Sequence, residues 1–214
     1  MNNRQAQTQG WLQQGILPVV VLNSVEEGLH IAHGLIQGGI TQIEITLRTP
    51  DAFKAMSAIA HRFPEMSISA GTVLSPTQLD QAADQGATLF ISPGFTETLA
   101  AHAIEKNYNW VPGVATASEL MRALELGFDV LKFFPAMAAG GPKALESIST
   151  PLPQAKWIPT GGIALDNLSQ WHAISSVKAV GGTWITTNLN NTENTAVTAL
   201  VAQRAGQALA AWAS

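Results

Sequence analysis

The sequence predicts a (β/α)8 barrel, an α/β fold in which eight parallel strands are each followed by a helix. Short apolar runs alternate with longer amphipathic segments, and successive runs start about 20 to 25 residues apart, the length of one strand–helix unit with short loops. Glycine pairs follow the last two runs, at Gly161-Gly162 and Gly181-Gly182, where many barrels hold a phosphate. An open doubly wound sheet would carry a glycine-rich loop after its first strand, and residues 23–25 contain no glycine.

The strands are expected where short runs rich in β-branched, leucine and aromatic residues stop at glycine, proline or polar residues. In chain order they are predicted at residues 15–22, 42–46, 67–70, 89–91, 110–111, 130–133, 156–159 and 177–180.

The helices are expected in the amphipathic segments between these runs and after the last one. Several begin behind a residue suited to capping a helix: Ser24 precedes an acidic first turn, Ser75 precedes Pro76, and Thr116 stands three residues before Glu119. They are predicted at residues 25–37, 51–62, 76–85, 97–106, 117–126, 142–149, 166–173 and 196–213. An extra helix at residues 4–14 is expected to close the bottom of the barrel. No linker or low-complexity tract divides the chain, so residues 1–214 are predicted to form a single barrel domain.

Composition narrows the classes of partner. Hydrophobic residues make up 46% of the 214 residues and charged residues 12%, and the net charge is −4, so we expect no nucleic acid and no anionic membrane as partner. The absence of cysteine excludes disulfides, thiolate metal sites and a cysteine nucleophile. No apolar run follows the first residues and the later apolar runs are short, so we expect neither a signal peptide nor a transmembrane helix. We therefore expect a cytoplasmic, soluble protein with a small-molecule partner.

Lys132 stands in an apolar run that reads as a buried strand ending at Pro135. Burial removes water from an ammonium group and so favours the neutral amine. A neutral amine attacks a carbonyl carbon to form a Schiff base. The alternative is a lysine whose stem is buried and whose head reaches water.

Glu44, on the second predicted strand, carries the charge opposite to that of Lys132. Alternation places Gln42, Glu44 and Thr46 on one face of that strand and the isoleucines between them on the other. A glutamate inside the barrel has to be paired or neutral, and Lys132 is its natural partner. The two residues form either a structural ion pair or a catalytic pair in which Glu44 is the general acid and base. We favour catalysis because charged groups buried together at strand ends are typical of functional sites.

Other polar and aromatic residues follow the strands at the predicted mouth. Arg48 is either a ligand for a substrate carboxylate or a surface arginine. Thr72 and Ser92 offer hydroxyl groups, either to a ligand or as caps of the next helix. Phe134 forms either a wall against a small substrate or part of the core.

The seventh strand is followed by Thr160, Gly161 and Gly162, and the eighth by Gly181, Gly182 and Thr183. Paired glycines expose consecutive amides and Thr183 adds a hydroxyl, so the two segments together predict a phosphate site.

The five histidines all fall on predicted helices, away from the strand ends, so we expect neither a metal nor another cofactor. They are His30, His33, His61, His102 and His172.

Taken together, the motifs resemble those of the 2-keto-3-deoxy-6-phosphogluconate (KDPG) aldolases, a family of class I aldolases that includes 4-hydroxy-2-oxoglutarate (KHG) aldolase. They follow one another from about residue 18 to residue 184, which covers nearly all of the barrel. The segments that carry the resemblance are 38–40, 43–49, 70–74, 91–94, 132–136, 159–163 and 181–184.

The resemblance implies a role for individual residues. Lys132 matches the lysine that forms the Schiff base with pyruvate, and Glu44 matches the glutamate that moves protons. Arg48 and Thr72 match residues at the pyruvate carboxylate, and Pro93 and Phe134 match the walls around it. The phosphate site is matched by Thr160, Gly161, Gly162, Gly182 and Thr183, the last of which is commonly serine in the family.

The reaction implied is cleavage of KDPG, or of its galactonate epimer, to pyruvate and glyceraldehyde 3-phosphate, the aldolase step of the Entner–Doudoroff route. A side activity on KHG, which would yield glyoxylate, is implied as well. Family members are typically homotrimers. The chain departs from the family at Met137 and Ala138, where polar residues are frequent, and at Ala115, where serine is frequent; these changes bear on substrate range and rate.

Two other functions stay open on the sequence. A metal-free sugar-phosphate isomerase or epimerase would share the phosphate site but needs no amine nucleophile, so Lys132 argues against it. A non-catalytic phosphosugar-binding barrel would keep the Glu44–Lys132 pair for structure alone, and an activity assay separates it from the enzyme.

Overall fold

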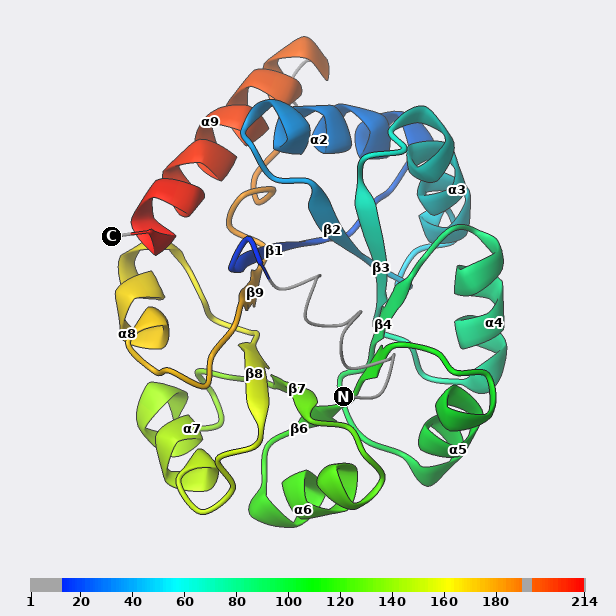
Figure 1. Cartoon of the computed structure of the whole chain (residues 1–214). Coiled ribbons are helices and arrows are strands. Elements are labelled where there is room, and N and C mark those ends of the chain that lie inside the picture. Colours follow the sequence, from blue (N-terminus) through cyan, green and yellow to red (C-terminus); the bar gives the residue numbers. More distant parts are fainter. Residues whose placement is uncertain (1–12, 190–193, 214) are drawn as a thin grey trace.

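The computed structural model describes residues 13–189 and 194–213, and there parallel strands surround a central axis with the helices outside them (Figure 1). The strands are β1 Ile16–Val20, β2 Gln42–Thr46, β3 Ser67–Gly71, β4 Leu89–Ile91, β5 Trp110–Val111, β6 Gly113–Val114, β7 Val130–Phe133, β8 Lys156–Pro159 and β9 Val180–Gly182.

The strands form two parallel sheets whose edges meet. One has the order β5-β4-β3-β2-β1-β9 and the other β6-β7-β8. Strand β5 is the predicted fifth strand, and β6 continues it beyond the predicted end, after an interruption at Pro112, which has no N–H to donate to a ladder. An isolated bridge between Thr160 and Gly181 joins the end of β8 to β9. The result is the eight-membered barrel that the sequence predicts.

The helices also agree with the prediction, mostly to within two residues at each end. The predicted caps are confirmed: Ser24 accepts a hydrogen bond from the Glu27 amide, Ser75 accepts one from the Gln78 amide, and Thr116 forms a capping box with Glu119. The helices are α2 Val25–Gln37, α3 Ala52–Arg62, α4 Pro76–Asp84, α5 Glu97–Glu105, α6 Ala117–Glu125, α7 Gly141–Ser149, α8 Leu168–His172 and α9 Asn194–Trp212, and a 3-10 helix spans Leu165–Asn167. None of these helices combines the length and the hydropathy that a membrane span requires.

Three predicted elements differ from the structure or lie mostly outside the described residues. The extra helix predicted at residues 4–14 lies outside the described residues, except for its last two, which form a turn. The helix predicted at 166–173 is divided into the 3-10 helix and α8. The eighth strand, predicted at 177–180, begins at Val180, because only there does the chain pair with Ile16 of β1; Val177 makes an isolated bridge with Trp157. Gly181 and Gly182 therefore end the strand instead of following it.

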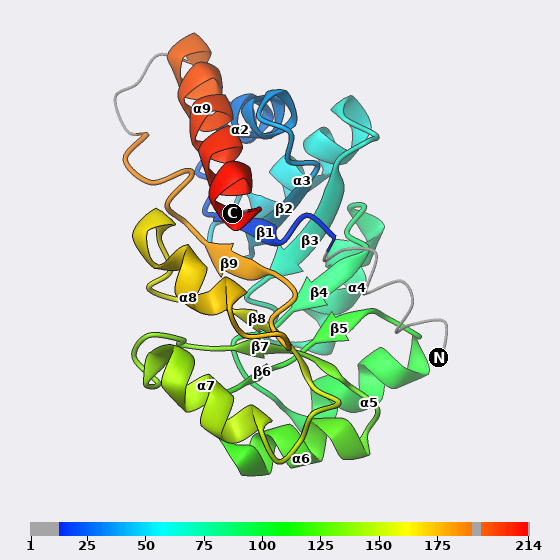
Figure 2. The same ribbon diagram turned by 60° about the vertical axis from the view of Figure 1, so that its left-hand side comes forward.

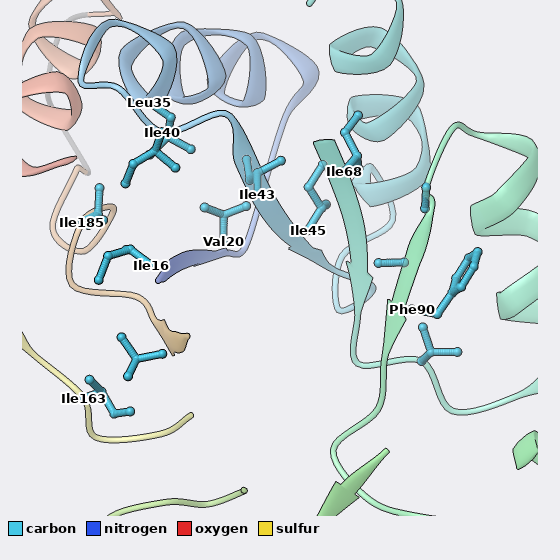
Figure 3. Packing of buried hydrophobic residues seen from close by; sticks show 14 of the residues in the cluster. Ile16, Val20, Leu35, Ile40, Ile43, Ile45, Ile68, Phe90, Ile163 and Ile185 are labelled. Atoms are coloured by element: carbon cyan, nitrogen blue, oxygen red, sulfur yellow. The ribbon is translucent and has the colours of Figure 1, made fainter. Parts of the chain in front are cut away.

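Two layers of apolar side chains hold the barrel together. The larger layer lies between the strands and the helices, and Figure 3 shows part of it, including Ile43 and Ile45 of β2. A second cluster fills the barrel interior with Leu17, Leu89, Ile91, Val111, Val130, Ile158 and Ala179. Glu44 and Lys132 share this interior, on the faces of β2 and β7 that alternation predicts.

Candidate active site

A cavity of about 210 Å³ lies at the C-terminal ends of the strands, the end at which barrels place their active sites. The structure brings together there eleven residues that the sequence proposed for the site, but not the candidates Ser92 and Gly181; the eleven are Glu44, Arg48, Thr72, Pro93, Lys132, Phe134, Thr160, Gly161, Gly162, Gly182 and Thr183. Three further residues line the cavity that the sequence did not propose for it: Val19, Thr46 and Ile163.

Lys132 and Glu44 meet across the barrel, from β7 and β2. The distance from Lys132 Nζ to Glu44 Oε1 is 3.2 Å, and the two side chains are 7% and 1% exposed. Nζ also lies 5.2 Å from the centroid of the Phe134 ring, on its face. Glu44 Oε2 is buried without a hydrogen-bond partner among the described residues. The amine is thus held away from water beside a carboxylate with one oxygen free to exchange a proton.

Gly71, at the end of β3, makes room for the Glu44 carboxylate. It pairs with Thr46 in the parallel ladder, and a Cβ atom at this position would overlap Glu44 Oε1. The residue is glycine, therefore, because the catalytic candidate occupies the space of a side chain.

Replacing Gly71 by alanine is expected to push the Glu44 carboxylate out of position and to lower kcat by about 10- to 100-fold, since misplacement of a reacting group by about 1 Å has an effect of this size. Steady-state kinetics on Gly71→Ala measures this. Gly94→Ala is the matched control, because a Cβ on Gly94, also at a strand exit, would meet no atom within 4 Å. Wild-type kcat in Gly71→Ala would contradict the placement of Glu44.

Thr46 connects Arg48 to the barrel wall. Its hydroxyl donates a hydrogen bond to the Val20 carbonyl (2.9 Å) and accepts one from Arg48 Nε (3.3 Å). Arg48 is exposed at the mouth of the cavity. This contact fixes Nε of its guanidinium group and leaves the two terminal nitrogens for an anionic ligand. The alternation that placed Glu44 inside the barrel also placed Thr46 there, and this was the signal that could have added it to the site.

The two hydroxyl residues at the strand exits differ in their surroundings. Thr72 lines the cavity with a φ of +58°, a left-handed conformation that is uncommon for a residue other than glycine and clusters at functional sites. It does not cap the next helix, because Ser75 does so. Ser92, by contrast, donates to the Val73 carbonyl and accepts from Trp110 Nε1, so its hydroxyl serves the packing of the barrel.

The loop after β8 is a rigid glycine turn. Gly161 and Gly162 have φ values of +104° and +77°, which side chains rarely adopt. The carbonyl oxygen of Gly161 accepts from the Met137 amide (3.0 Å), and that of Gly162 accepts from Asn167 Nδ2 (3.0 Å). Bonds from both sides thus fix the loop opposite Gly182 and Thr183.

The histidines lie on α2, α3, α5 and α8, as predicted, and none of them lines the cavity. Within residues 13–189 and 194–213, no three histidine, aspartate or glutamate side chains are grouped so that they could hold a metal ion.

Comparison with known proteins places this geometry in a family. The sequence model described as "KDPG and KHG aldolase" matches residues 10–200. The KHG/KDPG aldolase of Escherichia coli is 41% identical over 186 residues, which cover 86% of this chain and 87% of the relative. The 2-dehydro-3-deoxy-phosphogluconate aldolase of Dickeya dadantii is 42% identical over 170 residues, 79% of this chain and 80% of the relative.

Solved structures agree with the sequence matches. The KDPG aldolase of Legionella pneumophila, determined with pyruvate captured as a covalent carbinolamine, has a TM-score of 0.87 at 38% identity and covers 94% of this chain and 98% of its own. The KDPG aldolase of Zymomonas mobilis with 3-phosphoglycerate has a TM-score of 0.88 at 35% identity, covering 97% and 96%.

Proposed function

The chain belongs to the KDPG and KHG aldolase family, and from this membership and the geometry of the cavity we propose that it cleaves KDPG to pyruvate and glyceraldehyde 3-phosphate as a class I aldolase. The observation that carries the proposal is the buried pair of Lys132 and Glu44 beside a cavity that ends in two glycine-rich segments. A coupled assay that reduces the released pyruvate with lactate dehydrogenase and NADH tests it. Release of pyruvate from KDPG is expected, and its absence from folded protein would contradict it.

Lys132 is the nucleophile in the proposed mechanism. The ammonium group of Lys132 gives a proton to Glu44, and the resulting neutral amine attacks C2 of the substrate to form a carbinolamine. Glu44 returns the proton to the C2 hydroxyl, which leaves as water, so the products are an iminium ion and the Glu44 carboxylate. The iminium draws electrons from the C3–C4 bond. Cleavage of this bond therefore leaves an enamine instead of an unstabilised carbanion.

Glu44 moves the protons of the reaction. Its carboxylate takes the proton of the C4 hydroxyl as the C3–C4 bond breaks and the aldehyde leaves, and it then returns a proton to C3 of the enamine. Water hydrolyses the resulting imine and releases pyruvate and the free lysine. The unpartnered Oε2 supports this role, because a second oxygen remains available while Oε1 contacts the amine.

The two ends of the cavity orient the substrate. Arg48 and Thr72 bind the carboxylate beside C2, while Pro93 and Phe134 form the walls. At the other end, Gly161, Gly162, Gly182 and Thr183 bind the phosphate through amides and a hydroxyl, together with the neighbouring Thr160. Holding the substrate at both ends aligns C2 with the amine.

Inorganic phosphate is expected to compete with KDPG and to have little effect on the cleavage of KHG, which has no phosphate group. The reason is that the glycine-rich segments serve the phosphorylated substrate alone. Inhibition constants measured with both substrates at constant ionic strength check this. Equal inhibition of the two reactions would argue against a phosphate site at this end.

Substrate range and assembly stay predictions. We propose KDPG as the main substrate, with its galactonate epimer and KHG as further substrates to compare by kcat/KM. We also propose that the protein is a homotrimer, to be measured by analytical ultracentrifugation, and that it acts in the cytoplasm. An isomerase or a binding protein on the same barrel would form no covalent adduct with pyruvate, which distinguishes both from the aldolase.

A further inference from the structure

The segment after β9 is a tight turn that begins at the proposed phosphate site. We refer to residues 183–188 as the phosphate turn. The carbonyl oxygen of Thr183 accepts hydrogen bonds from the Thr186 amide (2.9 Å) and from the Thr187 hydroxyl (2.8 Å). The turn ends at Asn188, whose φ of +58° is the left-handed conformation that commonly ends a helical turn.

Arg204 holds the far end of the phosphate turn. It lies on α9 and donates from Nη1 to the carbonyl oxygens of Ile185 (3.2 Å) and Thr187 (2.7 Å). Helix α9 is a firm base for this contact, because it packs along α2, where the Thr198 hydroxyl donates to the His30 carbonyl. Figures 1 and 2 show α9 beside α2 in both views. Arg204 thus connects α9 to the phosphate turn.

Packing holds one face of the phosphate turn, where Trp184 and Ile185 pack against the core. Ile185 is buried and points into the core (Figure 3). Another face of the turn borders a second cavity of about 190 Å³, which is lined by Thr183, Thr186 and Thr187 of the turn, by Glu27 and Ile31 of α2, and by Val19 and Val21. Since this face lies against open space, the turn has room to shift there unless its carbonyl end is anchored.

The peptide groups of the phosphate turn lie between Arg204 and the proposed phosphate site, and their orientation relates the two. In a helical turn the amides point toward the first residue and the carbonyls toward the last. Arg204 therefore binds carbonyls at the end of the turn that lies away from Gly182, while the Thr186 amide closes the other end on the Thr183 carbonyl, next to the proposed phosphate ligands.

We propose that Arg204 is a positioning residue for the phosphate end of the substrate, acting through the carbonyls of the phosphate turn. The proposal rests on the proposed function, because it requires Gly182 and Thr183 to bind the substrate phosphate. It predicts that loss of Arg204 affects phosphorylated ligands and spares the chemistry at Lys132.

The test compares Arg204→Met with the wild-type protein on KDPG and on KHG. We expect KM for KDPG and the inhibition constant of inorganic phosphate to rise about tenfold in the variant, the effect of losing hydrogen bonds to a charged group. The kcat for KDPG, both constants for KHG and the rate of imine formation with pyruvate are expected to stay within about twofold. Arg204→Lys, which keeps a cationic donor, should recover part of the loss.

The control is Lys54→Met, which removes the same charge from an exposed site on α3 and should change none of these constants. An Arg204→Met protein with unchanged KM for KDPG would overturn the proposal, whether or not its Tm falls. A parallel rise in KM for both substrates would also overturn it, because a general loss of structure acts on both. A wild-type protein that cleaves neither substrate would instead refute the proposed function, so the two failures are distinguishable.

Discussion

Replacing Lys132 by methionine is expected to abolish the imine with pyruvate and to lower kcat for KDPG by at least about 10⁴-fold, since removal of a nucleophile has effects of this order. The methionine keeps the length of the side chain in the apolar interior but leaves Glu44 without its ion-pair partner. Removing one partner of a buried pair commonly lowers the free energy of unfolding by about 3–5 kcal/mol, so the variant is to be checked by circular dichroism before it is assayed.

Two further variants make this result specific to the amine. Lys132→Arg keeps a cation beside Glu44 but has no amine that forms an imine, so it should be inactive with smaller loss of stability. Lys156→Met removes a lysine on the adjacent strand β8 that is also ion-paired, 3.0 Å from Asp129, and it should keep full activity. Turnover of KDPG by folded Lys132→Met at a rate near that of the wild type would remove Lys132 from the mechanism.

Replacing Glu44 by glutamine is expected to lower kcat by about 10²- to 10⁴-fold, the range for loss of a general acid and base. The amide has nearly the same shape as the carboxylate and still contacts Lys132, but it cannot carry protons between the amine, the C4 hydroxyl and C3. The variant should therefore exchange the methyl protons of pyruvate with solvent deuterium more slowly by a similar factor, which nuclear magnetic resonance measures without the aldehyde substrate.

Glu97→Gln is the control for Glu44→Gln. Glu97 is exposed and ion-paired with Arg122 (2.6 Å), so the same chemical change there should leave both deuterium exchange and turnover unaltered. If Glu44→Gln exchanged the methyl protons of pyruvate as fast as the wild type, another group would have to move them.

Much of the fold could be predicted from the sequence because local patterns and packing agree. The strand β2 alternates isoleucines with polar residues, and the isoleucines do lie in the layer between strands and helices. The start of β9 could not be predicted, because it depends on where the chain meets β1, a contact between residues far apart in the sequence. Pro112 separates β5 from β6, and from the sequence it was expected to end the strand, so the continuation of the strand after it was not predicted.

The sequence predicted the residues that line the site better than the residues that hold them in position. Lys132 and Glu44 were conspicuous as charged residues within apolar strands, and glycines marked the phosphate end. Alternation placed Thr46 inside the barrel, but its hydrogen bond with Arg48 could not be predicted. The contacts of Arg204 could not be predicted either, since an arginine on a helix is common and its role depends on the atoms it meets. The need for glycine at position 71 could not be predicted either, because it arises from the Glu44 side chain on the adjacent strand.

The central claim is that Lys132 forms a covalent imine with pyruvate, and trapping that imine tests it most directly. The protein is incubated with pyruvate and borohydride, and its intact mass and proteolytic peptides are measured by mass spectrometry. One carboxyethyl group per chain, on the peptide that contains Lys132, is the predicted result. No adduct on folded protein, or an adduct confined to another lysine, would contradict it.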